Sequence, residues 1–397
     1  MKLAPHPTSE IELRVQKFKA RHASHPHLDA ANEAAWTACS RVGGENVVII
    51  TGSTGVGKST LARHLYKRLK ERCKDEIAQH PDVIPMVGLA AVSPTGRAFS
   101  WKDFYIRLLY RAGDPVTNQC LLAPTGNDMF GDSPYDTPAD RMLVDKLRRC
   151  VETTLRRRKT RWLIIDEAHH LLLHKDPHVN QIMFETLKSL AIETKLTIIL
   201  CGTYKLLDIR DQSAQLVRRS DLIHFQRYDL QDRKHHLGFR RVLRAFEDYF
   251  DLPEPVALVP DWEQYFIRSI GCVGILKDWL SKVYEKAMET NQTTFDLKFA
   301  MSFAHSNKEL ITITKEAQAG EIKLRDVSDD ELLSLLRPPK PKAADAKKSG
   351  AEDAEPATTG DAGLTGGVPS PKRPIATGRV GQRSPKRDTV GRPDLAA

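Results

Sequence analysis

Residues 52–59 are Gly52-Ser53-Thr54-Gly55-Val56-Gly57-Lys58-Ser59, which matches the full G-x-x-x-x-G-K-[ST] pattern of a phosphate-binding loop. The apolar run Val47 to Ile50 precedes the loop, as a buried strand would. Leucines at four-residue steps follow it, as they do on one face of a helix (Leu61, Leu65, Leu69). This order of strand, loop and helix predicts a nucleoside triphosphate ligand whose phosphates face the helix N-terminus.

The residue types of the loop explain how it would hold a triphosphate. Glycines let backbone N–H groups curl around the phosphates, Lys58 reaches the β and γ phosphates, and the Ser59 hydroxyl holds Mg²⁺. We therefore predict ATP and Mg²⁺ as cofactors. The predicted nucleotide-contacting residues are Gly52, Ser53, Thr54, Gly55, Val56, Gly57, Lys58, Ser59 and Thr60.

A second buried run, Trp162 to Ile165, ends in the acidic pair Asp166 and Glu167. A buried parallel strand would deliver both carboxylates to the carboxyl edge of the sheet, where open α/β sheets bind ligands. We predict that Asp166 contacts the nucleotide through Mg²⁺, together with Ser59, and that Glu167 polarises the attacking water. Small-molecule kinases use their substrate as the nucleophile and do not need this second acid, so Glu167 favours hydrolysis.

A third apolar run, Leu196 to Cys201, is followed by Gly202 and Thr203. In a parallel sheet Thr203 would lie beside Glu167 and could orient the same water. His170 and His174 are four residues apart, which resembles metal-ligand spacing. However, no H-E-x-x-H order is present and the acidic pair is assigned to the nucleotide, so solvated or anion-facing histidines are the preferred interpretation.

Two arginines, Arg218 and Arg219, end the segment 208–220 and precede a short apolar strand at 222–225. An arginine in this place can reach the γ-phosphate held by a neighbouring subunit and stabilise the transition state. The site would then be complete only in an oligomer. The alternative is an ordinary pair of surface arginines.

The segment 141–161 is strongly basic, within a chain of net charge +9. Only Asp145 and Glu152 oppose its nine cations, and a periodic apolar stripe predicts a helix with a buried face. Its outward face is either an ordinary solvated surface or a sequence-neutral contact with a nucleic-acid backbone. The cations are Arg141, Lys146, Arg148, Arg149, Arg156, Arg157, Arg158, Lys159 and Arg161, and the stripe is Leu143, Leu147, Val151 and Leu155.

Composition indicates a folded protein without a membrane span. The chain has 397 residues, 41% of them hydrophobic, which is enough for a core and two or three domains. No run approaches the roughly 20 apolar residues of a transmembrane helix, and the first residues lack a signal-peptide core, so we expect a cytoplasmic protein. Six scattered cysteines without a C-x-x-C pair predict neither a zinc site nor a disulfide framework.

Four regions follow from these patterns. Residues 1–45 form a helical lead-in, 46–229 an α/β ATPase core, 230–336 a helical region, and 337–397 a basic, Pro-rich segment that we predict to be disordered. The last region contains Ser-Pro-Lys-Arg twice, at 370–373 and 384–387. It is either a solvated linker or a tethered contact with DNA or a partner.

The order of these parts resembles the AAA+ ATPases, and the phrases LIIDEAHHLL, IILCGTYKLL and QLVRRS are most similar to the TniB/TnsC regulators of transposition. The resemblance implies an α/β fold, in which an AAA+ P-loop NTPase core with a parallel sheet carries a C-terminal helical lid. It places Thr203 at the sensor-1 position and Arg219 at the arginine finger, with Arg218 as the alternative. A sensor-2 arginine is missing after Gly274, where Lys277 is the nearest cation.

The function implied by the resemblance is ATP-dependent regulation of DNA transposition. Members of this family assemble on double-stranded DNA as homo-oligomeric rings or helical filaments, recruit a transposase, meet a TniQ-like target selector, and disassemble when ATP is hydrolysed. Two other functions share the same motifs. One is an AAA+ helicase loader or replication initiator, and the other is a protein-remodelling signalling ATPase that does not use DNA.

Overall fold

The computed structural model describes residues 10–41, 47–93, 99–114, 142–172, 177–211, 217–218 and 220–336. The chain forms two compact units, Met1–Ser328 and Asp329–Ala397. In the second unit the structure describes helix α16 (Asp329–Leu336), which lies at the end of the predicted helical region 230–336. The predicted disorder of residues 337–397 lies outside the described residues. The predicted domain boundaries stay predictions.

The first unit is built around a five-stranded parallel sheet in the order β2-β3-β4-β1-β5. The register aligns the carboxyl ends of the central strands, since Thr51 pairs with Gly202 and Ala90 with Asp166. Each predicted strand is present, which confirms the α/β fold class. The strands are β1 (Val47–Thr51), β2 (Met86–Ala90), β3 (Trp162–Asp166), β4 (Thr197–Gly202) and β5 (Ser220–His224).

Strand β2 begins at Met86, although apolar residues precede it from Val83. Pro85 has no N–H to give to a ladder, so regular pairing starts at Met86. The carbonyl of Pro85 still accepts the N–H groups of Arg161 and Trp162, at 2.7 and 3.1 Å. The proline therefore sets the beginning of the β2–β3 pairing rather than breaking it.

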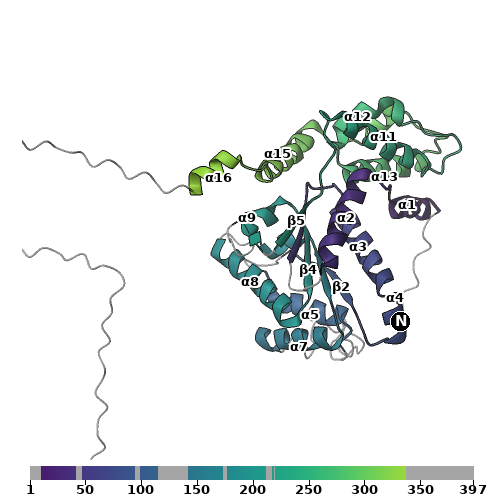
Figure 1. Cartoon of the computed structure of the whole chain (residues 1–397). Helices are drawn as coiled ribbons and strands as arrows, with labels where there is room; N and C mark the ends of the chain where they lie inside the picture. The colour runs from purple at the N-terminus through teal and green to yellow at the C-terminus, as the bar shows by residue number, and fades with distance from the viewer. Residues whose placement is uncertain are drawn as a thin grey trace, which may run out of the picture. The chain divides into compact units, whose positions relative to one another are not determined.

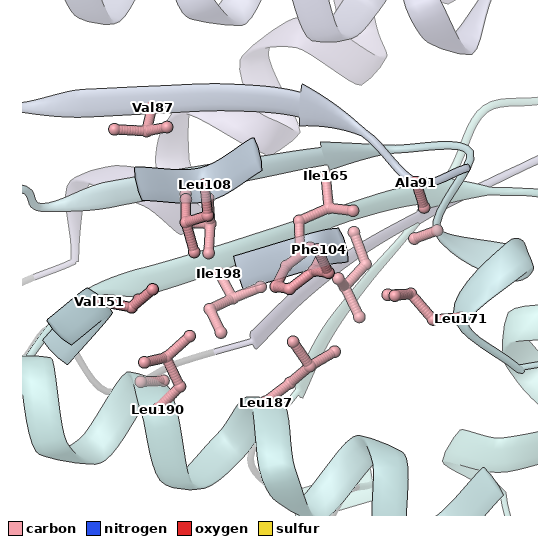
Figure 2. Close-up of a cluster of buried hydrophobic side chains, with 14 of the residues drawn as sticks. Val87, Ala91, Phe104, Leu108, Val151, Ile165, Leu171, Leu187, Leu190 and Ile198 are labelled. Atoms are coloured by element: carbon pink, nitrogen blue, oxygen red, sulfur yellow. The ribbon is translucent and has the colours of Figure 1, made fainter. Parts of the chain in front are cut away.

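Helices cover both faces of the sheet (Figure 1). Helices α2 (Pro26–Ser40) and α3 (Lys58–Arg72) pack on one face, where Leu61, Leu65 and Leu69 are fully buried. On the other face Phe104, Leu108, Val151, Leu187 and Leu190 pack against strand residues such as Ile165 and Ile198, as Figure 2 shows. The helices there are α5 (Trp101–Arg111), α7 (Val144–Arg157) and α8 (Pro177–Thr194).

One prediction about the basic helix is wrong. Leu147, Val151 and Leu155 of the predicted stripe are buried, but Leu143 is 78% exposed. Leu143 is the N-cap residue of α7, with φ −69° and ψ 148°, so it lies outside the helix and does not continue its apolar face. A periodic pattern does not reveal where the helix begins when the cap residue is apolar.

A helical lid follows the sheet and has its own aromatic core. Its principal helices enclose Phe239, Trp279 and Tyr284. Helix α1 (Glu10–Ala20) joins this core through Phe18, which is 1% exposed and stacks on Phe250 at 5.1 Å. The lid helices are α11 (Arg233–Glu247), α12 (Trp262–Ser269), α13 (Val273–Glu289), α14 (Leu297–Met301) and α15 (Asn307–Lys323).

The last lid helix, α15, also contacts the core beside the end of β4. A side chain at Gly320 would place its Cβ 2.1 Å from the Tyr204 ring, so only glycine allows this close approach. Arg227 donates to Glu321 through two nitrogens, at 2.7 and 3.1 Å. Lid and core are thus joined next to the residue that follows Thr203.

The remaining short elements are α4 (Lys74–Gln79), α9 (Leu207–Arg210), and the 3-10 segments η2 (Ala168–Leu172), η3 (Tyr204–Leu206) and η4 (Val259–Asp261). Among the described helices, none combines the length and apolarity needed to cross a bilayer.

Candidate nucleotide-binding site

The predicted phosphate loop joins β1 to α3 at the carboxyl edge of the sheet. Gly55 and Gly57 have φ of +75° and +115°, a region that favours glycine. A Cβ on Gly52 would lie 2.4 Å from the carbonyl oxygen of Phe225. Helix α3 begins at Lys58, so the amino end of the helix lies at the loop. The backbone therefore forms an anion-binding concavity.

Lys58 is buried in this loop, with 8% of its surface exposed. Its Nζ donates to the carbonyl oxygens of Gly52 at 3.1 Å and Ser53 at 2.8 Å. Burial lowers the pKa of Lys58, and the nearby carboxylates of Glu167 and Asp166 oppose that shift. A buried ammonium held by carbonyl oxygens fits a group that exchanges these partners for phosphate oxygens.

The acidic pair lies where the sequence predicts it, at the end of β3. Glu167 adopts a left-handed backbone with φ of 52°, and its N–H donates to the Asp166 carboxylate at 2.9 Å. Non-glycine residues adopt this region rarely, and such conformations concentrate at functional sites. The turn directs the two carboxylates differently although they are adjacent in sequence.

His169 lies against Glu167, with its Nδ1 3.2 Å from Oε2. Burial lowers the pKa of His169 to about 4, so the ring is neutral near pH 7, and the contact lacks hydrogen-bond geometry. Donor atoms of Glu167, His169 and His170 lie within 4.8 Å of one another. His174, the second histidine of the four-residue spacing, lies outside the described residues. His170 Nδ1 instead lies 3.0 Å from the Ser93 hydroxyl.

Thr203 directly follows β4, the neighbour of β3, as predicted. Its hydroxyl oxygen is buried and has no hydrogen-bond partner among the described residues, and the same is true of Thr51 at the end of β1. Buried hydroxyls without partners are costly, so their position at the carboxyl edge fits an oxygen-rich ligand. The glycine concavity, Lys58, the two carboxylates and these hydroxyls together suit a nucleotide with its Mg²⁺.

A hollow of about 40 Å³ lies beside the phosphate loop, between the lead-in, the core and the lid. It is lined by His22, His25, Val56, Gly274 and Lys277, among others. The lid closes it against the loop, since the N–H of Gly274 donates to the Gly55 carbonyl at 2.7 Å. Ligand pockets commonly measure about 300–1,000 Å³, so entry of a nucleoside would require the lid to move away from the loop.

Comparison with known proteins is consistent with this geometry. Residues 41–209 match a family model described as an AAA domain, a range that holds the loop, the acidic pair and Thr203. Over this range the chain is similar to AAA domains, and its parallel sheet has the AAA+ P-loop fold. A comparison with curated proteins gives no match.

Several solved structures are similar to this chain at low identity. ORC2 of Aeropyrum pernix is 13% identical, with 73% of this chain and 72% of that chain covered and a TM-score of 0.49. A Walker-type ATPase of Pyrococcus abyssi is 15% identical, with 80% of each chain covered and a TM-score of 0.43. Domain III of the replication initiation protein DnaA of Thermotoga maritima is 15% identical, with 74% and 96% covered and a TM-score of 0.39.

Lys277, which the sequence analysis places nearest to the expected sensor-2 position, is engaged elsewhere. Its Nζ donates to the carbonyl oxygens of Lys19 at 2.6 Å and Arg21 at 2.8 Å, which end helix α1. It also lies 3.2 Å from His22 Nδ1. In this conformation Lys277 fixes the lead-in to the lid rather than reaching toward the loop.

Arg218 lies near the amino ends of the strands, whereas the phosphate loop of the same chain lies at their carboxyl ends. It precedes β5, whose first residue, Ser220, pairs with Val47 at the beginning of β1. The loop follows the other end of β1, about 16 Å away at 3.3 Å per residue. Arg218 is exposed. Arg219, the predicted arginine finger, lies outside the described residues.

His25 joins the beginning of α2 to Tyr228, which follows β5, and it gives a testable pH dependence. It caps α2 by accepting the N–H of Leu28, and the Tyr228 hydroxyl lies 3.1 Å from the same Nδ1. Burial, with a smaller contribution from His27, lowers the pKa of His25 to about 4. The unfolded chain therefore binds this proton more readily, and stability falls as the pH drops from about 6.5 toward 4.

We expect His25→Asn to reduce the acid sensitivity of folding, because Asn retains the capping acceptor but does not titrate. Thermal unfolding at pH 7.5 and pH 5 should show a drop in stability that is smaller than the parent's by roughly 2 kcal/mol. A variant that folds normally at pH 7.5 and keeps the parent's full loss at pH 5 would contradict this assignment.

Proposed function

We propose that this protein is an ATP-dependent regulator of DNA transposition that hydrolyses ATP at a site shared between subunits. The backbone of Gly52 to Thr60 and the Lys58 ammonium bind the phosphates, and Glu167 polarises the attacking water while Thr203 orients it. Ser59 and Asp166 would hold Mg²⁺, which would supply positive charge beside the phosphates.

The observation that carries the shared site is the position of Arg218. The Arg218 side chain begins at the amino edge of the sheet, and the phosphate loop lies at the carboxyl edge. Arg218 therefore does not suit the γ-phosphate of the same subunit, whereas it suits that of an adjacent one. Homo-oligomerisation in a ring or helical filament would bring the two halves of each site together.

The proposal of transposition rests on the family resemblance of the motifs around Asp166, Thr203 and Arg219, and on the basic character of the chain. Repeated basic surfaces along an oligomer would follow the phosphate backbone of double-stranded DNA without reading its sequence. A transposase and a TniQ-like target selector are the proposed protein partners. ATP hydrolysis would end the assembly by removing the γ-phosphate that joins adjacent subunits.

Electron microscopy of the purified protein tests this function. With ATP, Mg²⁺ and duplex DNA together, we expect rings or filaments on the DNA, and we expect them to be lost when any one of the three is left out. Monomers under every condition would contradict the proposal. Assemblies that require single-stranded DNA would instead select a helicase loader or replication initiator.

A further inference from the structure

The cations of the basic helix α7 form two groups that differ in their surroundings. Toward α8, Arg148 donates to Glu152 at 2.9 Å and to the Ser189 hydroxyl at 2.8 Å. Arg156 donates to the carbonyl oxygen of Glu193 at 3.0 Å. These two arginines stabilise the α7–α8 packing, so their charge is compensated within the chain.

Two more cations of the basic segment stabilise the turn after α7. Arg158 donates to the carbonyl oxygens of Asp82, at 3.1 Å, and Gly113. Arg161 forms an ion pair with Glu76. Four arginines of the basic run thus have internal structural roles and are not available to a ligand.

A basic row lies on the exposed surface of α7, and we define it as Lys146, Arg149 and Arg157. All three side chains are exposed, and none makes a hydrogen bond or ion pair with any described residue. They line one hollow of about 380 Å³ together with Thr153 and Cys150. The row spans about 16 Å along the helix axis, at 1.5 Å per residue.

The chemistry of this hollow favours an extended polyanion. Its one carboxylate, Asp114, accepts a hydrogen bond from the Thr154 hydroxyl at 2.8 Å, and Thr153 adds a hydroxyl beside the cations. Its described lining contains no aromatic side chain. Proteins that hold single strands stack bases on aromatic rings, so this lining suits a duplex backbone better.

We propose that the basic row binds the sugar-phosphate backbone of duplex DNA. The inference rests on the proposed function, because it assigns the DNA contact of that function to the basic row of α7. Three cations that each neutralise one phosphate release counterions, and this makes binding depend on salt. The contact would be independent of base sequence.

The test is a triple variant, Lys146→Gln with Arg149→Gln and Arg157→Gln, titrated with a labelled duplex at several salt concentrations in the presence of ATP and Mg²⁺. We expect at least tenfold weaker binding at about 100 mM salt. The slope of log affinity against log salt should become less steep by about 2.7, from 0.9 per phosphate contact. ATP turnover without DNA should equal the parent's, because the row does not line the nucleotide site.

The matched control is Lys282→Gln with Lys298→Gln and Lys308→Gln. These lysines are exposed on the lid and have no side-chain partner among the described residues, so the control removes the same three charges. Parental affinity in the control and weak binding in the row variant support the inference. Equal losses in both, or no loss in the row variant, overturn it. A parent protein that does not bind duplex DNA at all overturns the proposed function itself.

Discussion

Replacing Glu167 with Gln is expected to reduce ATP turnover by about 10²- to 10⁴-fold, because an amide cannot accept a proton from the attacking water. Nucleotide affinity should stay near the parent's, since the loop backbone and Lys58 hold the phosphates and Glu167 does not contact them in our assignment. Phosphate release and equilibrium nucleotide binding, measured on the same preparation, separate the two effects. Assemblies formed with ATP should persist longer than those of the parent.

The control for this prediction is Glu263→Gln, which changes an exposed glutamate on α12 far along the chain from the site. It should behave like the parent in both measurements. If Glu167→Gln turned over ATP at the parental rate, or assembled less well with ATP than the parent, the role of Glu167 would be wrong.

Substituting Arg218 and Arg219 together with Ala is expected to lower turnover by about 10³- to 10⁵-fold, the range seen when an arginine finger is supplied or removed. Mixing this variant with Lys58→Ala should restore part of the activity. In a mixed oligomer, some interfaces combine the intact loop of one variant with the intact arginines of the other. Turnover per total protein should rise with the mixing ratio and pass through a maximum.

A doubly defective chain, with Lys58→Ala as well as both arginine substitutions, is the control for the mixing experiment. It offers neither half of a site, so adding it to either variant should restore nothing. Equal activity in both mixtures would contradict a shared site. Parental turnover by the double arginine variant alone would show that the two residues are surface arginines without a catalytic role.

The sequence predicts the central part of the site well because its determinants are local. Gly52 to Ser59 specify a loop by their own φ angles and side chains, and the apolar runs before Asp166 and Thr203 end in the expected place. Neighbouring positions for these two residues follow from the pairing of adjacent parallel strands, which the observed register contains.

Features that depend on long-range packing cannot be predicted from local sequence patterns. Lys277 looks like a substitute for a sensor-2 arginine, but its contacts with the carbonyl oxygens of Lys19 and Arg21 cross more than 250 positions. The place of His25 in the hollow depends on Tyr228, which is 203 residues away in the sequence. The closure of Gly274 on Gly55 leaves no periodic signal at all.

The basic run at 141–161 is a second feature that depends on long-range packing. Charge counting treats Arg148 and Lys146 alike, yet Arg148 hydrogen-bonds to Ser189, 41 residues away, and Lys146 has no side-chain partner among the described residues. The packing of α7 on α8 and the contacts of the turn after α7 separate the two groups of cations. The sequence therefore indicates a basic surface but not which of its residues are available to a ligand.

The most direct test of the account is the rate of ATP hydrolysis with and without duplex DNA, at low and high salt. We predict that duplex DNA raises the rate and that the increase disappears as salt rises, because DNA gathers subunits whose sites are complete only at their interfaces. A rate that is the same with and without DNA at every salt concentration would contradict a DNA-assembled ATPase. It would favour an ATPase that acts on proteins alone.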